Sequence, residues 1–257
     1  MPIIVAGASQ SSISAQPSDF KVEVNHDPVS VTSVMPLSGK HLRYVLIHDA
    51  RLHDDWPGGV DQQIHVAKEF LKQVISPGVD TGTLVSYGEL VDLGPQNQRD
   101  PRKLASEVGT GRIGPARLYD AITAGTSWLA KQPTGPDERK VVFLVCDGKE
   151  AGSHVSRAEA LKALHKGSFP IFVIAPSDVE KRNQGRLLQD LAEQSGGRAY
   201  FLPPNWHLAF DGLKRDLADS FLLGLNLPSQ KGLLALSIAE IGHPQLSIVA
   251  SPQVFVP

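Results

Sequence analysis

Two aspartates that follow apolar, strand-like runs are the residues of this sequence best placed to do chemistry. Asp49 ends the stretch that contains the apolar run Tyr44–Ile47, and Asp147 follows the run Lys140–Cys146. Where such runs are neighbouring strands of an open α/β sheet, the loops that follow them face one crevice. Two carboxylates there could hold a divalent cation, act as an acid and base pair, or pair with nearby arginines. Taken alone, the two aspartates favour the last use, ion pairing and capping at strand ends.

A glycine-rich segment and a cluster of ionisable residues suggest two further kinds of site. Residues Gly109–Gly114 match the pattern G-x-G-x-x-G, but they follow a helix-like segment instead of the strand that a dinucleotide site requires. The stretch around Asp49 contains histidines and acids that raise the alternative of a zinc site or a shifted calcium site, although no predicted helix orders them. These residues are His48, His53, Asp54 and Asp55.

The composition is that of an ordinary globular protein. The 257 residues include 25 basic and 27 acidic side chains, and no basic block of the kind that lines a nucleic-acid groove. No apolar run is long enough to span a bilayer. The single cysteine, Cys146, lies inside an apolar run and is expected to be a buried core residue. We therefore expect neither a nucleic-acid partner nor a membrane span.

The middle of the chain alternates predicted strands with predicted helices. This alternation predicts an α/β fold in which a doubly wound, mostly parallel sheet is flanked by helices. Ser156 and Glu159 have the spacing of a capping box at the start of one helix. The expected strands are 42–49, 140–146, 169–175 and 198–202, with a hairpin at 83–87 and 89–93, and the expected helices are 60–75, 101–108, 117–131, 153–165, 182–195 and 206–219.

Both ends of the chain are predicted to contain strands without helices. Residues 19–38 and 222–257 contain segments typical of strands, and we expect them to pair as a small accessory β element. The α/β domain is therefore expected to occupy residues 39–221. Residues 1–18 end in small side chains and are interpreted as a flexible tail or the remnant of a signal peptide, which suggests export to the periplasm or the cell exterior.

Four stretches, in this order, carry a resemblance to a known family. They are the strand end Leu46–Asp49, the stretch Gly114–Ala121, the strand Val141–Gly148, and Phe221–Leu225 near the end of the chain. With these landmarks the chain resembles a von Willebrand factor type A domain, and in particular the bacterial exported proteins that carry this domain between short β segments. The resemblance covers the chain from about Phe20 to its end, and it implies a Rossmann-like fold and a role in protein binding.

Domains of this family hold a magnesium or manganese ion with a D-x-S-x-S motif, a threonine and a second aspartate. In this sequence the matching aspartates are Asp49 and Asp147, whereas Arg51 and His53 stand in place of the serines and Ala116 in place of the threonine. Magnesium requires near-octahedral oxygen ligands, and a guanidinium repels a cation. The metal-ion-dependent adhesion site is therefore expected to be degenerate and to hold no cofactor, with weak Mg²⁺ or Mn²⁺ binding as the alternative.

An arginine can neutralise two carboxylates where a metal ion cannot bind. A planar guanidinium forms bidentate pairs with carboxylates. We predict that Arg51, or alternatively Arg117, lies between Asp49 and Asp147. The surrounding loops are the predicted partner-binding surface, on which basic residues contact an acidic group of a partner directly. This surface comprises Arg51, Asp54, Asp55, Trp56, Arg112 and Arg117.

The function expected from these features is a non-enzymatic protein-interaction module, either adhesion-like or scaffold-like. One alternative is a divalent-cation-dependent adhesion domain in which Asp54 or Asp55 replaces the missing hydroxyl ligands. Another alternative is a hydrolase that uses the paired aspartates. The hydrolase is the least favoured, because no nucleophile or base accompanies the aspartates in the sequence.

Overall fold

A six-stranded sheet forms the centre of the computed structural model, which describes residues 1–6, 15–52, 59–109, 111, 113–202, 207–240 and 247–256. Its strands are β5 (His41–Asp49), β6 (Thr81–Tyr87), β7 (Val91–Leu93), β8 (Glu138–Val145), β9 (Ile171–Pro176) and β10 (Ala199–Leu202). Their order in space is β10-β9-β8-β5-β6-β7. Neighbours are parallel except β7, which pairs antiparallel with β6 in the predicted hairpin. The chain moves outward from β5 to β7 in one direction and from β8 to β10 in the other.

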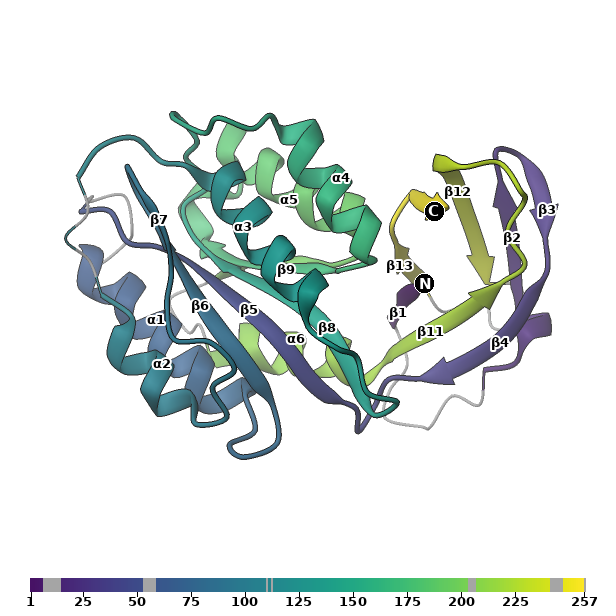
Figure 1. Ribbon diagram of the computed structural model, residues 1–257, viewed down its shortest axis with the longest axis horizontal. Helices are drawn as coiled ribbons and strands as arrows, with labels where there is room; N and C mark the ends of the chain where they lie inside the picture. The colour runs from purple at the N-terminus through teal and green to yellow at the C-terminus, as the bar shows by residue number, and fades with distance from the viewer. Residues whose placement is uncertain are drawn as a thin grey trace.

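Helices cover both faces of this sheet (Figure 1). They are α1 (Gly59–Val74), α2 (Pro101–Glu107), α3 (Leu118–Lys131), α4 (Arg157–Gly167), α5 (Asn183–Ser195) and α6 (His207–Ala218), with 3-10 turns at Pro17–Asp19 and Ser177–Val179. Val45 and Ile47 of β5 point into the core under α3, α4 and α5, whereas Tyr44 and Leu46 point into the core under α1, α2 and α6. The protein is thus a mixed α/β protein with a mostly parallel central sheet, which confirms that part of the predicted fold class. Among the residues that the structure describes, no helix combines the length and apolarity needed to cross a membrane.

The predicted capping box is present at the start of α4. The Ser156 backbone N–H donates to Glu159 Oε2 at 2.7 Å, and the Glu159 backbone N–H donates to Ser156 Oγ at 3.3 Å. These two bonds satisfy N–H groups that have no partner within the helix. We therefore expect Ser156→Ala to lower the free energy of unfolding by about 1 kcal/mol. Chemical denaturation measures this loss, and Ser106→Ala inside α2 is the control, because alanine there replaces an exposed helical serine without removing a cap.

Strands from the two ends of the chain form an accessory element of two four-stranded antiparallel sheets. They are β1 (Pro2–Ala6), β2 (Phe20–Val24), β3 (Asp27–Val29), β4 (Val31–Pro36), β11 (Ser220–Leu225), β12 (Gly232–Glu240), β13 (Ser247–Ala250) and β14 (Gln253–Val256). The sheet orders are β13-β1-β11-β4 and β14-β12-β2-β3. Strands of the two ends pair directly, β2 with β12 and β4 with β11. Apolar side chains of both sheets share a third core, and both termini lie in this element (Figure 1).

Two boundaries differ from the sequence prediction. The sequence predicts a flexible tail for residues 1–18, but residues 2–6 form β1, which lies between β13 and β11. Ile3 and Ile4 of β1 are buried, so an apolar segment interpreted as a signal-peptide remnant belongs to the packed structure. The sequence also places the end of the α/β domain at residue 221, whereas β11 already belongs to the accessory element. Both differences have one physical reason: the partners of these strands lie far away in the sequence.

Candidate functional site

Asp49 and Asp147 emerge side by side at the carboxyl edge of the central sheet. Strands β5 and β8 are parallel neighbours with His48 opposite Val145, so Asp49 follows one residue after this pair and Asp147 two residues after it, at the same edge of the sheet. Asp49 is fully buried and Asp147 is 1% exposed. Gln63 of α1 donates from Nε2 to the Asp49 carbonyl oxygen at 2.8 Å and ties the strand end to this helix. The fold therefore brings the two predicted acids into one buried site.

The guanidinium of Arg51 lies between the two carboxylates, as the sequence predicts. Its Nε donates to Asp49 Oδ1 at 3.0 Å and its Nη2 donates to Asp49 Oδ2 at 2.6 Å, which together make a bidentate pair. The same Nη2 donates to Asp147 Oδ1 at 3.3 Å. Two backbone N–H groups also donate to these carboxylates: that of Arg51 to Asp49 Oδ1 at 3.1 Å, and that of Lys149 to Asp147 Oδ1 at 2.9 Å. The Arg51 guanidinium thus joins the ends of two strands.

The electrostatics of this cluster are those of a buried ion pair. Only 11% of the Arg51 side chain is exposed, and this burial by itself lowers its pKa. The hydrogen bond and the charge of Asp49 outweigh burial, so the net effect is a raised pKa for Arg51. Burial, followed by the charge of Asp49, raises the pKa of Tyr87 well above its usual value, and burial with Asp147 does the same for Cys146. The Tyr87 phenol and the Cys146 thiol are therefore neutral at neutral pH. Cys146 is the buried core residue that the sequence predicts.

The described residues around the two aspartates do not fit a divalent cation. Arg51 directs N–H donors into the space that a cation bridging Asp49 and Asp147 would need. Ala116 is fully buried and supplies no side-chain oxygen, and its carbonyl oxygen already accepts the Ala151 N–H at 3.0 Å. In the part of the chain that is described, no group of three or more His, Cys, Asp or Glu residues is placed to hold a metal. The described residues thus offer an ion pair at this place and not the oxygen shell that magnesium requires.

The other predicted site residues fall into two groups. Arg117 is the N-cap residue of α3, and its Nη1 lies 3.2 Å from His154 Nδ1, so among the described residues its side chain contacts this histidine and not the aspartates. The second group lies outside the described residues and comprises His53, Asp54, Asp55, Trp56 and Arg112. Burial also revises one assignment: Arg51 is engaged inside the protein, so its charge is not free to receive an acidic group of a partner.

Three exposed apolar side chains that the sequence reasoning missed lie on loops at the same edge of the sheet. Leu52 follows Arg51 directly and is 60% exposed, Leu90 in the β6–β7 hairpin is 61% exposed, and Ile113 before α3 is 77% exposed. The hairpin and the loop before α3 approach each other, because a Cβ added at Gly114 would lie 2.8 Å from Glu89 Cβ. We call Leu52, Leu90 and Ile113 the apolar rim. The sequence pattern that could have revealed them is a large apolar residue inside an otherwise polar loop.

Comparison with known proteins supports the fold alone. No protein-family model matches the chain, and no curated protein sequence does. Proximal thread matrix protein 1 from the mussel byssus has a similar structure, with a TM-score of 0.54 at 16% identity over 76% of this chain and 50% of that one. The D319A mutant of the PilB minor pilin from Streptococcus sanguinis matches with a TM-score of 0.46 at 10% identity, over 70% of this chain and 62% of that one. This chain thus spans less than two thirds of either protein.

Proposed function

We propose that this protein is a non-enzymatic protein-interaction module of the von Willebrand factor A type whose metal site has been replaced by an internal cation. The observation that carries this proposal is the position of Arg51, which pairs with Asp49 and also contacts Asp147. The proposal is supported by the place of the two neighbouring acids, at the point where the strand order diverges, which is where open α/β sheets build their sites. The guanidinium supplies the positive charge that keeps these carboxylates buried.

The apolar rim supports a partner-binding role for the same edge of the sheet. Large apolar side chains exposed together on loops are uncommon on surfaces that face only water, and they mark sites of protein association. Leu52 adjoins Arg51 in the sequence, so the ion pair orders the backbone that presents it. In this proposal the buried cluster is a scaffold, and the neighbouring loops make the contacts. A secreted location suits such a module, and the mussel protein with a similar structure is named as a matrix protein.

Two other functions make different experimental demands. A cation-dependent adhesion domain that uses Asp54 or Asp55 requires a divalent ion for partner binding, whereas the proposed module does not. A hydrolase based on Asp49 and Asp147 requires at least one of these carboxylates to be free to act, and Arg51 opposes this by hydrogen bonding to both. The module is therefore expected to bind its partner equally well in EDTA and in excess Mg²⁺ or Mn²⁺.

The apolar rim is tested with the partner that the wild-type protein captures from extracellular material of its source. We expect the double variant Leu52→Asp with Ile113→Asp to bind this partner at least about tenfold more weakly, because it charges two exposed anchors without touching the core. The matched control is Leu233→Asp, since Leu233 is 37% exposed on β12 of the accessory element. Surface plasmon resonance measures both affinities. Unchanged binding by the double variant, or binding abolished by EDTA, would reject this proposal.

A further inference from the structure

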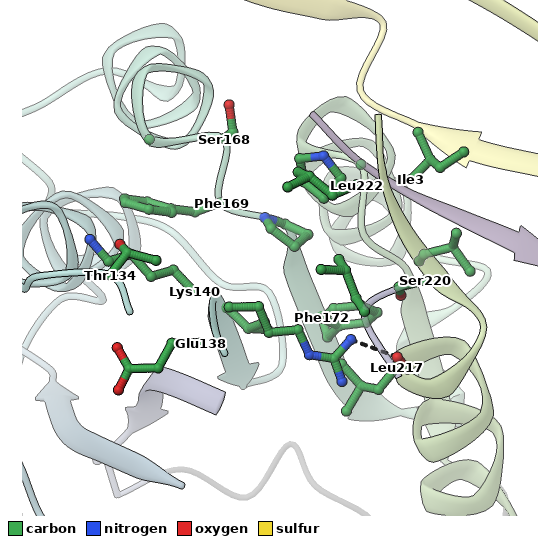
Figure 2. A pocket seen from close by; sticks show the side chains of 18 residues that line it. Ile3, Thr134, Glu138, Lys140, Ser168, Phe169, Phe172, Leu217, Ser220 and Leu222 are labelled. Atoms are coloured by element: carbon green, nitrogen blue, oxygen red, sulfur yellow. Dashed lines mark hydrogen bonds between the residues drawn. The ribbon is translucent and has the colours of Figure 1, made fainter. Parts of the chain in front are cut away.

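A cavity lies where the central sheet meets the accessory element, at the edge opposite to Asp49 and Asp147. Its volume is ≈ 200 Å³, and apolar side chains form most of its wall. Figure 2 shows Phe169 on one side of this space and Ile3 and Leu222 on the other, with Phe172 between them. Apolar cavities at the junction of two structural units are common places for small ligands to bind. This cavity is separate from the site described above. Glu138, in the cavity wall, is the first residue of β8, whereas Asp147 follows the last residue of the same strand.

Arg139 brings a positive charge to this cavity without a carboxylate partner among the described residues. Its Nη1 donates to the Leu217 carbonyl oxygen at 2.6 Å, the bond drawn in Figure 2, and its buried Nε has no hydrogen-bond partner within the described part of the chain. The charge of Asp80 acts on Arg139 from a distance. The Asp80 carboxylate accepts the N–H groups of Leu42 and Ser76 at 2.7 Å each, and within the described part of the chain it forms no salt bridge with Arg139.

The remaining charges around the cavity also leave a positive excess. Glu138, the acid in the wall, is held by Arg43 through bonds of 3.2 Å and 2.7 Å. Lys140 adds a second cation to the wall, and its Nζ donates to the Gln132 carbonyl oxygen at 2.6 Å. Burial lowers the pKa of Arg139 to about 10, so its guanidinium is still charged at neutral pH. A charge buried without a counter-ion is costly, and an anionic ligand would remove that cost.

We propose that this cavity binds an unbranched aliphatic monocarboxylate, with the carboxylate on Arg139 and the hydrocarbon chain between Phe172, Ile3 and Leu222. A guanidinium recognises a carboxylate through N–H bonds, and Arg139 lines the cavity with its Nε unpaired among the described residues. The wall is mainly apolar, so a ligand with one charged end and a hydrocarbon body matches it better than a polar anion does. The assignment does not depend on the protein-interaction role proposed above.

Titration of the wild-type protein with ligands of graded chain length and charge tests the assignment. Isothermal titration calorimetry with hexanoate and octanoate is expected to show octanoate binding about fifteenfold more tightly, from about fourfold for each of two added methylenes. Octan-1-ol and octylammonium are expected to bind at least about tenfold more weakly than octanoate, because neither replaces the missing counter-ion. No octanoate binding, equal binding of octanol, or no dependence on chain length would overturn the proposal.

Substitutions at the cavity locate the binding. Arg139→Met retains an unbranched apolar stem and removes the charge. Octanoate binding is therefore expected to weaken at least about tenfold, whereas octanol binding is expected to stay unchanged. Arg157→Met is the matched control, since Arg157 forms an ion pair with Asp190 on the surface. Leu222→Trp fills the cavity and is expected to abolish octanoate binding with Arg139 in place. Wild-type affinity in folded Arg139→Met or Leu222→Trp protein would refute the assignment, and the wild-type titrations decide it if neither variant folds.

Discussion

Arg51→Met is expected to lower the free energy of unfolding by about 3–5 kcal/mol, the cost of leaving a buried ion pair without one of its partners. Asp49 would lose both bonds of its bidentate pair, and Asp147 would lose its contact with Arg51 Nη2. Methionine retains the apolar stem of the arginine, so the loss reports the charge and its hydrogen bonds more than the packing. Urea denaturation followed by circular dichroism measures the change.

The chain contains a matched control for this substitution. Asp100 and Arg102 have the same spacing and also pair, at 3.1 Å, but the two side chains are 37% and 89% exposed. Arg102→Met is therefore expected to cost less than about 1 kcal/mol, as exposed ion pairs do. A variant that combines Arg51→Met with Asp49→Asn and Asp147→Asn removes all three charges, and we expect it to recover part of the loss. An effect of Arg51→Met as small as that of Arg102→Met would show that the buried pair does not stabilise the fold.

Adding oxygen ligands beside Asp49 and Asp147 is expected to create tight divalent-cation binding, which we do not expect of the wild-type protein. The wild-type protein should bind neither Mg²⁺ nor Mn²⁺ more tightly than about 1 mM, which corresponds to about 4 kcal/mol. The triple variant Arg51→Ser, His53→Ser and Ala116→Thr removes the guanidinium and introduces the three hydroxyl residues that the motif of the von Willebrand factor type A family has at these positions. We expect it to bind Mn²⁺ at least about tenfold more tightly than the wild type, because hard cations require several oxygen ligands. Calorimetry measures both affinities.

Two controls separate metal binding from general effects of the triple variant. Adding Asp49→Asn removes one of the two carboxylates and should abolish the new binding. The second control is the single variant Ala116→Thr. Ala116 is fully buried, so the added atoms are expected to cost about 1–3 kcal/mol of stability by overpacking. Tight Mn²⁺ binding by the wild type would contradict the proposed loss of the metal site. A folded triple variant that binds no metal would show that other residues also changed.

Local sequence patterns were sufficient for most of the α/β part. The run Tyr44–Ile47 predicts a strand buried on both faces, and its four side chains are fully buried in two cores. The capping box of Ser156 and Glu159 was also predictable, because a cap depends on residues three positions apart. β1 was not predictable, since the apolar residues 2–6 become a strand only when β11 and β13 supply the hydrogen-bond partners.

One pattern, Asp-x-Arg, separates what the sequence determined from what the tertiary structure decided. It occurs at Asp49–Arg51, Asp100–Arg102 and Asp137–Arg139, and the sequence determined which charges are available at each place. In the first pair the arginine holds two buried carboxylates, and in the second it forms an exposed pair. In the third, Asp137 pairs with Lys40 and Arg139 turns into the cavity.

The physical reason for these three outcomes is that the strength and direction of an ion pair depend on burial and on neighbouring charges. Burial and neighbours are set by the strands and helices that pack around each pair. The sequence therefore determined that an arginine follows the acid at the end of β5, and that hydroxyl ligands are missing there. Only the packing of β5 against β8 decided that Arg51 reaches Asp147, and only the docking of the accessory strands decided that Arg139 faces an apolar cavity.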